Sequence, residues 1–230
     1  MNMLNQFLWV IFPYVMITIS IVGLVFRYKT DQMSWSARSS EFLEKRELRW
    51  GSILFHYGII FVFFGHVVGI LVPARVVSGL GINDDIYHLF AVVTGGLAGL
   101  IATFGIILLI KRRFGNERIL VTSSFSDKLL LILLFLSMGV GLYNTLIFNL
   151  FIGGFDYRTT LAPWLRSLFI FSPNPQLMVD VPLSYQIHVL IAFLVVGIWP
   201  FSRLVHILSI PTSFIYRANI LFREEIHFND

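Results

Sequence analysis

Residues 51–73 of the chain read GSILFHYGIIFVFFGHVVGILVP. After its first glycine this stretch contains no Asp, Glu, Lys or Arg, and a proline ends it. An α-helix needs about 20 consecutive apolar residues to cross the hydrocarbon core of a bilayer, so the stretch predicts a membrane-spanning helix. It also contains His56 and His66. Because ionisable side chains inside a bilayer are costly and usually functional, the stretch predicts chemistry within the membrane.

Four further runs have the same apolar character, so the chain is predicted to cross the membrane five times. The predicted spans are residues 4–26, 52–72, 86–110, 129–151 and 183–210. Only the last contains a charged residue, Arg203, which lies close to its end. Pro13 and Pro200 fall within spans and predict kinks, because proline removes a backbone hydrogen bond. The predicted fold class is an all-α membrane protein with one integral domain over residues 1–230, of which residues 211–230 form a tail.

The composition of the whole chain agrees with this fold class. Of its 230 residues, 57% are hydrophobic and 13% are charged, whereas about 25% of residues are charged in soluble domains. This excludes a soluble globular enzyme, a disordered chain and a nucleic-acid-binding module, although the net charge is +4. The absence of cysteine excludes disulfides, thiolate zinc sites, cysteine-ligated iron–sulfur clusters and covalently attached haem. Any metal must be held by histidine or by oxygen ligands.

The distribution of Lys and Arg predicts the orientation of the chain. Segments 27–50, 111–128 and 203–230 contain fourteen of the 17 Lys and Arg residues. Loops rich in Lys and Arg stay on the cytoplasmic side of a membrane. We therefore expect a multi-pass protein of the plasma (inner) membrane with its N-terminus outside and its C-terminus in the cytoplasm.

The predicted outer loop, residues 152–182, has a character of its own. Pro163 is suited to the first position of a short helix. Trp164 and the apolar residues after it predict a segment that lies in the membrane interface rather than crossing the bilayer.

Besides His88 at the start of the third span, four histidines lie inside the predicted spans, two on the second and two on the fifth. A lone histidine in a bilayer can simply hydrogen-bond to a neighbouring helix, but two on each of two helices predict pairing. Because the two spans are antiparallel, His56 is expected beside His206 near the cytoplasm and His66 beside His188 near the outer face. Positions 56 and 66 are roughly 15 Å apart along a helix, and positions 188 and 206 are five turns, or roughly 27 Å, apart. Helix tilt, an oblique ligand axis and the kink at Pro200 are expected to absorb the difference.

The cofactor that suits two such pairs is haem. Zinc requires further ligands, and no cysteine or carboxylate lies at these depths, whereas haem iron takes two axial ligands and the porphyrin supplies the other four. Gly65 and Gly69 beside His66 would let a flat ring approach the backbone, although ordinary close packing of helices explains such glycines equally. Arg203 and Arg112 are candidates to hold haem propionates; the alternative is that they only signal topology.

Several motifs carry a resemblance to a known family. They are residues 51–56 (GSILFH), 65–73 (GHVVGILVP) and 199–206 (WPFSRLVH), with further similarity in residues 39–46, 111–114 and 154–160. Together these motifs resemble the gamma subunit of respiratory nitrate reductase, and the likeness covers essentially the whole chain, including its length and five spans.

The resemblance implies a five-helix cytochrome b with two b-type haems. It implies that His56 and His206 ligate the iron of the inner haem, and His66 and His188 that of the outer haem. It further implies that the subunit oxidises a membrane quinol, menaquinol or ubiquinol, near the outer haem and passes electrons inward. The partners would be a molybdenum-cofactor subunit and an iron–sulfur subunit on the cytoplasmic side, with nitrate reduced on a partner, together with membrane lipid and the quinone pool but no nucleic acid.

The quinol site is predicted at the outer start of the third span. His88, beside Tyr87, can hydrogen-bond a quinol oxygen or take its proton, and Gly65 and His66 would form the other wall. Many relatives carry a lysine in this neighbourhood, where this chain has Tyr87-His88-Leu89. The alternative is that His88 and Tyr87 only anchor the helix end in the interface.

Two other functions stay open from the sequence. A related membrane cytochrome b would share the four histidines but feed a heterodisulfide- or sulfite-reductase-type complex. A haem-free polytopic anchor or transporter belongs to a different class. Transporters usually show inverted repeats and broken helices around a central site, and the sequence shows neither.

Overall fold

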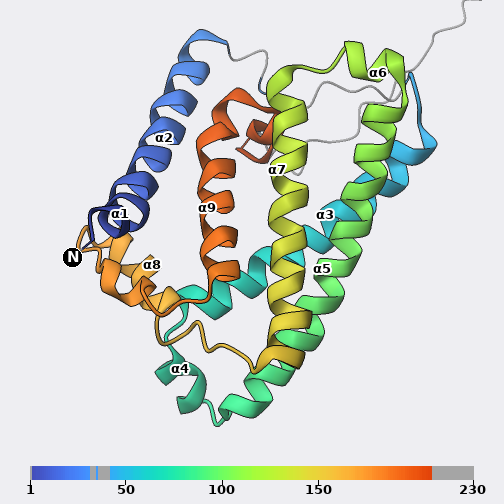
Figure 1. Ribbon diagram of the computed structural model, residues 1–230. Coiled ribbons are helices and arrows are strands. Elements are labelled where there is room, and N and C mark those ends of the chain that lie inside the picture. Colours follow the sequence, from blue (N-terminus) through green and yellow to red (C-terminus); the bar gives the residue numbers. More distant parts are fainter. Residues whose placement is uncertain (1, 32–34, 36–41, 209–230) are drawn as a thin grey trace, which may run out of the picture.

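The computed structural model describes residues 2–31, 35 and 42–208, and the secondary structure of these residues is helical (Figure 1). Five helical stretches are long and apolar enough to cross a membrane, as the sequence predicts. They are Met3–Thr30, Arg46–Leu71, Asp84–Gly115, Phe125–Ile152 and Leu183–Phe201. Residues 39–41, the end of the predicted fifth span at 209–210 and the tail 211–230 lie outside the described residues.

These stretches are built from α-helices extended by short irregular turns. The α-helices are α1 (Met3–Gln6), α2 (Phe12–Thr30), α3 (Arg46–His66), α4 (Ala74–Gly79), α5 (Asp84–Gly115), α6 (Glu117–Val121), α7 (Phe125–Leu142), α8 (Leu161–Phe169) and α9 (Leu183–Ile198). The π-helical turns are η1 (Phe7–Ile11), η3 (Val67–Leu71) and η4 (Tyr143–Ile152). The 3₁₀ turns are η5 (Pro175–Met178), η6 (Trp199–Phe201) and η7 (Arg203–Leu208).

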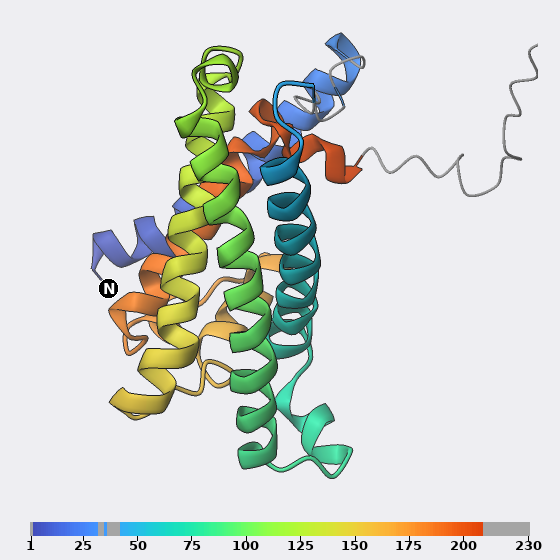
Figure 2. The ribbon, with the colours of Figure 1, turned by 90° about the vertical axis from the view of Figure 1, so that its right-hand side faces the viewer.

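The helices α2, α9, α7 and α5 stand in a row, and α3 crosses one face of that row (Figures 1 and 2). The close packing of α3 on α5 depends on glycine. A Cβ atom at Gly58 would lie 2.5 Å from the backbone nitrogen of Ala102 and 2.6 Å from its Cβ. By contrast, α3 and α9 are not among the closely packed helix pairs of the described residues.

The described parts of the three segments rich in Lys and Arg meet at one end of the bundle, which we call the α6 end (Figure 1). Arg27 at the end of α2 donates to the carbonyl oxygen of Pro200, at 2.6 Å. Arg112 at the end of α5 binds Glu44, which precedes α3. The alternating helix directions that the sequence predicts therefore bring these segments together.

The opposite end, called the α4 end, is closed by the segment between η4 and α9. Helix α8 has nine residues, too few to cross a bilayer. It begins at Leu161, two residues before the predicted start at Pro163. The indole of Trp164 is fully buried against Trp9 and donates to the Trp9 carbonyl oxygen at 3.0 Å, and the interfacial position of the segment stays a prediction. A long-range partner on the first span has drawn this side chain into the protein core.

The prolines distort their spans where the sequence predicts distortion. Pro13 lies in the first turn of α2, directly after the π-helical turn η1. Helix α9 ends at Ile198, Pro200 lies within a 3₁₀ turn, and Ser202 is extended. The expectation of five regular turns between His188 and His206 is therefore wrong. Proline lacks the N–H that would continue the α-helix, and the chain proceeds as short 3₁₀ turns.

Candidate functional site

The four intramembrane histidines form two pairs, as the sequence predicts. The rings of His56 on α3 and His206 on η7 have centroids 6.0 Å apart. The rings of His66 on α3 and His188 on α9 have centroids 6.1 Å apart. We call these the α6-side pair and the α4-side pair, after the ends of the bundle to which they lie nearer. The break after Ile198 is what lets His206 reach the level of His56.

Every one of these imidazoles binds a backbone carbonyl oxygen through Nδ1. The acceptors are Ser52 at 2.7 Å for His56, Val62 at 2.7 Å for His66, Ser137 at 3.0 Å for His188 and Arg203 at 2.6 Å for His206. A carbonyl oxygen only accepts, so each Nδ1 carries the proton and each Nε2 carries an electron pair. This is how proteins orient histidines that ligate a metal through Nε2.

The position of His206 is fixed from α7. Asp127 accepts a hydrogen bond from the backbone nitrogen of Arg203 at 3.2 Å and from its Nε at 2.7 Å. The carbonyl oxygen of the same arginine holds Nδ1 of His206. Asp127 therefore ties the short turn that carries His206 to the start of α7.

The ring of His188 is also placed by α7. Besides the carbonyl oxygen of Ser137, it contacts Gly141, where a Cβ atom would lie 3.0 Å from Cε1 of the ring. A glycine at this position gives the imidazole its room.

Each pair suits a metal ion that brings its other ligands with it. Two imidazoles bound at about 2 Å on opposite sides of one ion place their ring centroids about 6 Å apart. In the described part of the chain, no cluster of three or more His, Asp or Glu side chains could hold a metal. His56 and His66 are exposed in the chain by itself, although exposed imidazoles inside a bilayer are costly. Haem meets these conditions, because it covers both rings and supplies four nitrogens.

The glycines near the pairs divide into two groups. A Cβ atom at Gly65 would meet nothing within 4 Å, so there is room beside His66 for a flat group. The others pack against side chains, as in ordinary helix contacts. These are Gly69 against Tyr157 and Tyr87, Gly96 against Leu146, Gly99 against Leu142 and Gly197 against Met16.

The two candidate propionate arginines each hold a protein carboxylate. Arg112 has a side chain only 3% exposed and binds the Glu44 carboxylate at 2.8 Å. Arg203 binds Asp127 at 2.7 Å. Burial raises the pKa of Glu44, but hydrogen bonds from the backbone nitrogen of Glu47 and from Arg112 more than offset this, so the pKa lies below its usual value.

His88 lines a cavity of about 720 Å³ at the α4 end, between α5 and the segment 146–156. Most of the wall is apolar. The polar side chains of the lining are those of His88, Asn149 and Asp156. Gly65 and His66 are not among the residues that line this cavity. Tyr87, the neighbour of His88, links this region to the turn that follows His66. The Tyr87 hydroxyl hydrogen-bonds that of Tyr157 at 3.1 Å, and both hydroxyls lie against Gly69.

An ion-pair cluster adjoins this cavity. The buried guanidinium of Arg158 binds Asp156 at 2.9 Å and Asp84 at 3.0 Å. It lies 4.3 Å from the centre of the Tyr87 ring and 3.5 Å from Nε2 of His88. Burial raises the pKa of Asp156, but hydrogen bonds from Arg158 outweigh it, so this pKa lies below its usual value.

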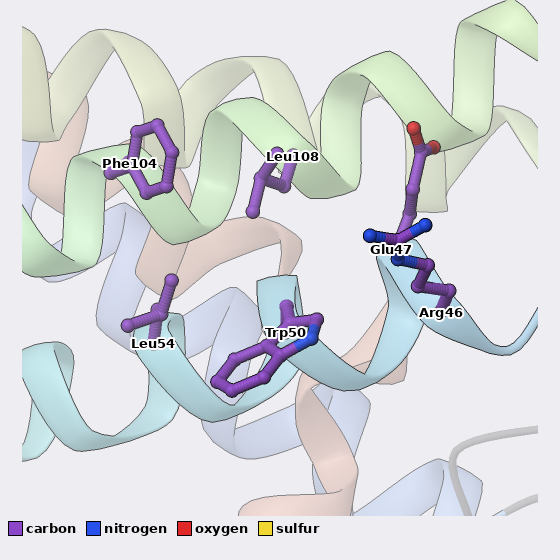
Figure 3. A pocket seen from close by; sticks show the side chains of 6 residues that line it. All are labelled: Arg46, Glu47, Trp50, Leu54, Phe104 and Leu108. Atoms are coloured by element: carbon purple, nitrogen blue, oxygen red, sulfur yellow. The ribbon is translucent and has the colours of Figure 1, made fainter.

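A second cavity, of about 420 Å³, lies at the α6 end between α3 and α5. Figure 3 shows Trp50 and Leu54 of α3 facing Phe104 and Leu108 of α5, with Arg46 and Glu47 at one end of the group. No histidine lines it, so it is separate from both pairs.

Sequence reasoning missed several residues of these sites. Asp127 and Gly141 act on His206 and His188 from a different helix, and local spacing does not reveal such contacts. Asp156 and Arg158 lie within the 154–160 motif, so there a signal was present, although the motif alone does not assign a role.

The comparisons with known proteins extend over nearly the whole chain. The family model described as nitrate reductase gamma subunit matches residues 5–225. The nitrate reductase gamma chain of Bacillus subtilis (strain 168) is 45% identical over 222 residues, which cover 96% of this chain and 99% of the relative. The respiratory nitrate reductase 1 gamma chain of Escherichia coli (strain K12) is 30% identical over 224 residues, or 97% of this chain and 99% of the relative. The nitrate reductase-like protein NarX of Mycobacterium tuberculosis (strain ATCC 25618 / H37Rv) is 37% identical over 96% of this chain, which corresponds to 34% of that longer protein.

Proposed function

The chain belongs to the nitrate reductase gamma subunit family, and from this premise we propose that it is the membrane-embedded, quinol-oxidising cytochrome b subunit of a respiratory nitrate reductase. The match to gamma chains over their full length favours this function over a heterodisulfide- or sulfite-reductase-type cytochrome and over a haem-free anchor or transporter.

The observation that carries the proposal is the presence of two imidazole pairs at two depths between α3 and the α9–η7 segment. His56 and His206 hold one haem b, and His66 and His188 hold the other. When bound, each haem supplies a one-electron redox centre inside the membrane. The backbone carbonyl oxygens of this chain orient the axial imidazoles through the Nδ1 hydrogen bonds. Arg203 and Arg112 are proposed to donate hydrogen bonds to haem propionates.

The α6 end faces the cytoplasm in this proposal. Support comes from the positive residues that the fold collects there, since such residues favour the cytoplasmic side. The pair His56 and His206 is then the inner one. A gamma chain implies alpha and beta partners, and we propose a molybdenum-cofactor subunit and an iron–sulfur subunit docked at this end, with nitrate reduced on the former.

Quinol is oxidised at the α4 end, near the outer pair. His88 hydrogen-bonds a quinol oxygen or takes its proton in the cavity that it lines, and Gly65 and His66 remain proposed as the wall on the haem side. Each quinol, menaquinol or ubiquinol, gives up two protons to the outside and two electrons to the inside. Moving one elementary charge across the membrane is worth about 2.3 kcal/mol per 100 mV, so the reaction helps to build the membrane potential.

The test counts haem in single-site variants of the purified complex, by reduced-minus-oxidised spectra and by pyridine haemochrome. We expect His56→Ala and His206→Ala each to lose one haem, and His66→Ala and His188→Ala each to lose the other. His88→Ala is the matched control, because it removes an imidazole that belongs to neither pair and should keep both haems while quinol oxidation falls. Full haem content in any of the four ligand variants contradicts the assignment.

A further inference from the structure

The segment that carries His206 leaves the regular helix before it reaches this ligand. Helix α9 ends at Ile198, and the chain continues as two 3₁₀ turns with the extended residue Ser202 between them. Carbonyl oxygens in such a segment lack the regular partners of an α-helix, although an unsatisfied backbone group is costly inside a bilayer. Neighbouring helices must therefore supply partners, and these partners fix the course of the segment.

Arg27, at the end of α2, supplies donors to this segment. Its Nη1 atom donates to the carbonyl oxygen of Pro200 at 2.6 Å and to that of Ser202 at 2.9 Å. Pro200 and Ser202 are both buried, so water has little access to these oxygens. One guanidinium nitrogen thus takes the place of the helical hydrogen bonds that the break has removed.

The peptide unit that joins Ser202 to Arg203 is held from two helices. Its carbonyl oxygen accepts from Arg27 of α2, and its N–H donates to Asp127 of α7 at 3.2 Å. A trans peptide unit is planar, and its C=O and N–H groups point in opposite directions. The two contacts therefore fix the orientation of one peptide plane between the first and the fourth span.

This peptide plane comes directly before the carbonyl group that orients His206. The next carbonyl oxygen along the chain, that of Arg203, accepts from Nδ1 of His206 at 2.6 Å. Consecutive peptide planes share a Cα atom, so a rotation of the first plane moves this oxygen and, with it, the imidazole. The hydrogen bonds of Arg27 therefore reach the ligand through the backbone.

Gly23, one turn before Arg27 on α2, receives the same segment. A Cβ atom at position 23 would lie 2.7 Å from Cγ and 2.8 Å from Cβ of Pro200. The pyrrolidine ring is rigid and cannot fold aside as a long side chain can. Gly23 by its small size and Arg27 by its hydrogen bonds together hold residues 200–202, and we call these two residues the α2 seat.

We propose that Arg27 is a positioning residue for the inner haem: with Asp127 it fixes the peptide unit before Arg203 and so determines where the imidazole of His206 lies. This inference rests on the proposed function, because His206 is an axial ligand only if the chain binds haem. It gives the first span, which carries none of the four paired histidines, a part in the haem site.

The orientation of an axial imidazole can be measured on the ferric haem. In a low-spin haem with two imidazole ligands, the highest g value of the electron paramagnetic resonance spectrum depends on the angle between the ring planes. These planes meet at 68° in the α6-side pair and at 31° in the α4-side pair. We therefore expect two separate signals, and the one that is lost in His206→Ala belongs to the inner haem.

The test compares variants of the purified complex. Arg27→Met removes the donors and keeps the apolar part of the side chain. We expect the highest g value of the inner haem to move, while that of the outer haem stays. The inner haem should also transfer to an excess of an apo haem-binding protein about tenfold faster or more, because outer-shell partners contribute about 10–100-fold to metal affinity. Arg27→Lys, which keeps a charged donor, should restore the inner signal.

Two further variants separate the hydrogen bonds from other effects. Lys29→Met is the matched control, because it removes a positive charge from the same helix end, is exposed and takes no part in the α2 seat. It should keep both signals. Gly23→Ala leaves every donor in place but displaces Pro200, so it should move the inner signal alone. This variant also decides the question if the Arg27→Met complex does not assemble.

The outcomes distinguish this inference from the proposed function. A wild-type inner signal in Arg27→Met, or in Gly23→Ala if Arg27→Met does not assemble, overturns the inference. An equal change of both haem signals, or the same shift in Lys29→Met, overturns it as well, because neither reports the position of His206. In all these cases the proposed function stands if the four ligand variants lose the expected haems, whereas full haem content in those variants removes the proposed function itself.

Discussion

Gly141 on α7 lies directly against the imidazole of His188 on α9: a Cβ atom at position 141 would be 3.0 Å from Cε1 of the ring. The same ring donates through Nδ1 to the carbonyl oxygen of Ser137, one turn earlier on α7. Together these contacts leave the ring little freedom, so α7 sets the direction in which Nε2 points. The helix next to the ligand, and not only the helix that carries it, determines the geometry of the α4-side pair.

The first prediction follows from this contact. Gly141→Ala should displace the His188 ring, because such overpacking typically costs about 1–3 kcal/mol when neighbours must move. We expect the outer b-type haem to be lost or spectrally altered while the inner haem stays, measured by low-temperature difference spectra of the purified complex. Gly139→Ala is the control, since a Cβ atom there meets nothing within 4 Å. Equal spectra for the two variants would show that the contact does not constrain the ring.

The second prediction concerns the link from Asp127 through Arg203 to His206. Asp127→Asn removes the charge that holds Arg203, so the turn carrying His206 should loosen. Substituting an outer-shell partner typically costs about 10–100-fold in metal affinity, and we expect haem loss confined to the inner site. The measurement is the rate of haem transfer from the purified variant to an excess of an apo haem-binding protein.

Ser124→Ala provides the control for that experiment. Ser124 caps α7 by accepting a hydrogen bond from the backbone nitrogen of Asp127 at 3.1 Å, and loss of such a cap costs about 1 kcal/mol. The Ser124→Ala substitution therefore weakens the same end of α7 and leaves the ion pair of Arg203 with Asp127 in place. If Ser124→Ala releases the inner haem as readily as Asp127→Asn, the ion pair has no specific role.

The features that the sequence predicted are those encoded in local composition. Apolar runs of sufficient length predicted five spans, and alternating directions placed His56 with His206 and His66 with His188. The end of α9 at Ile198 and the 3₁₀ turns after it could not be derived, because Pro200 indicates a distortion but not its form. The burial of Trp164 depends on Trp9, on the first span, and a pattern within one segment does not report such a partner.

The candidate site shows the same division. The histidines stand out because an imidazole is rare in an apolar run. The positioning groups Asp127, Gly141 and Asp156 look like ordinary helix-start, helix-packing and loop residues. Arg112 illustrates a further difficulty, since its charge suggested a cofactor contact while it donates to Glu44, from a segment far away in the chain.

The third prediction concerns the packing of α3 on α5. Gly58→Ala would place a Cβ atom 2.5 Å from the backbone nitrogen of Ala102, and backbone atoms cannot move aside as a flexible side chain can. We expect α3 to shift as a whole, with a loss of about 1–3 kcal/mol in stability and weakened binding of both haems. The test is the thermal midpoint at which haem absorbance is lost. Gly95→Ala, in open space on α5, should leave this midpoint unchanged, and a similar midpoint for both variants would contradict the prediction.

The fourth prediction concerns the acid stability of the loop held by Arg158. The pKa of Asp156 lies below its usual value of 3.8, because hydrogen bonds from Arg158 outweigh the effect of burial. A carboxyl whose pKa is lower in the folded state stabilises the fold above its unfolded pKa and loses this contribution as pH falls through the folded pKa. The loop should therefore stay anchored at pH 4 and loosen at lower pH. Pepsin is active in this range, and its cleavage rate between residues 153 and 160 of the purified complex reports the loosening.

Arg158→Gln tests the cause of that stability. Without the guanidinium, Asp156 keeps the hydrogen bond from the backbone N–H of residue 158, but burial, which raises its pKa, is opposed by fewer interactions. The carboxyl then protonates at higher pH, and we expect pepsin to cleave the segment rapidly already at pH 4. Arg166→Gln is the matched control, because Arg166 belongs to the same region but donates to the carbonyl oxygen of Ile70 rather than to Asp156. If cleavage of the Arg158→Gln complex follows the wild-type pH dependence, the guanidinium does not anchor the loop through Asp156, and its charge acts only on the cavity side.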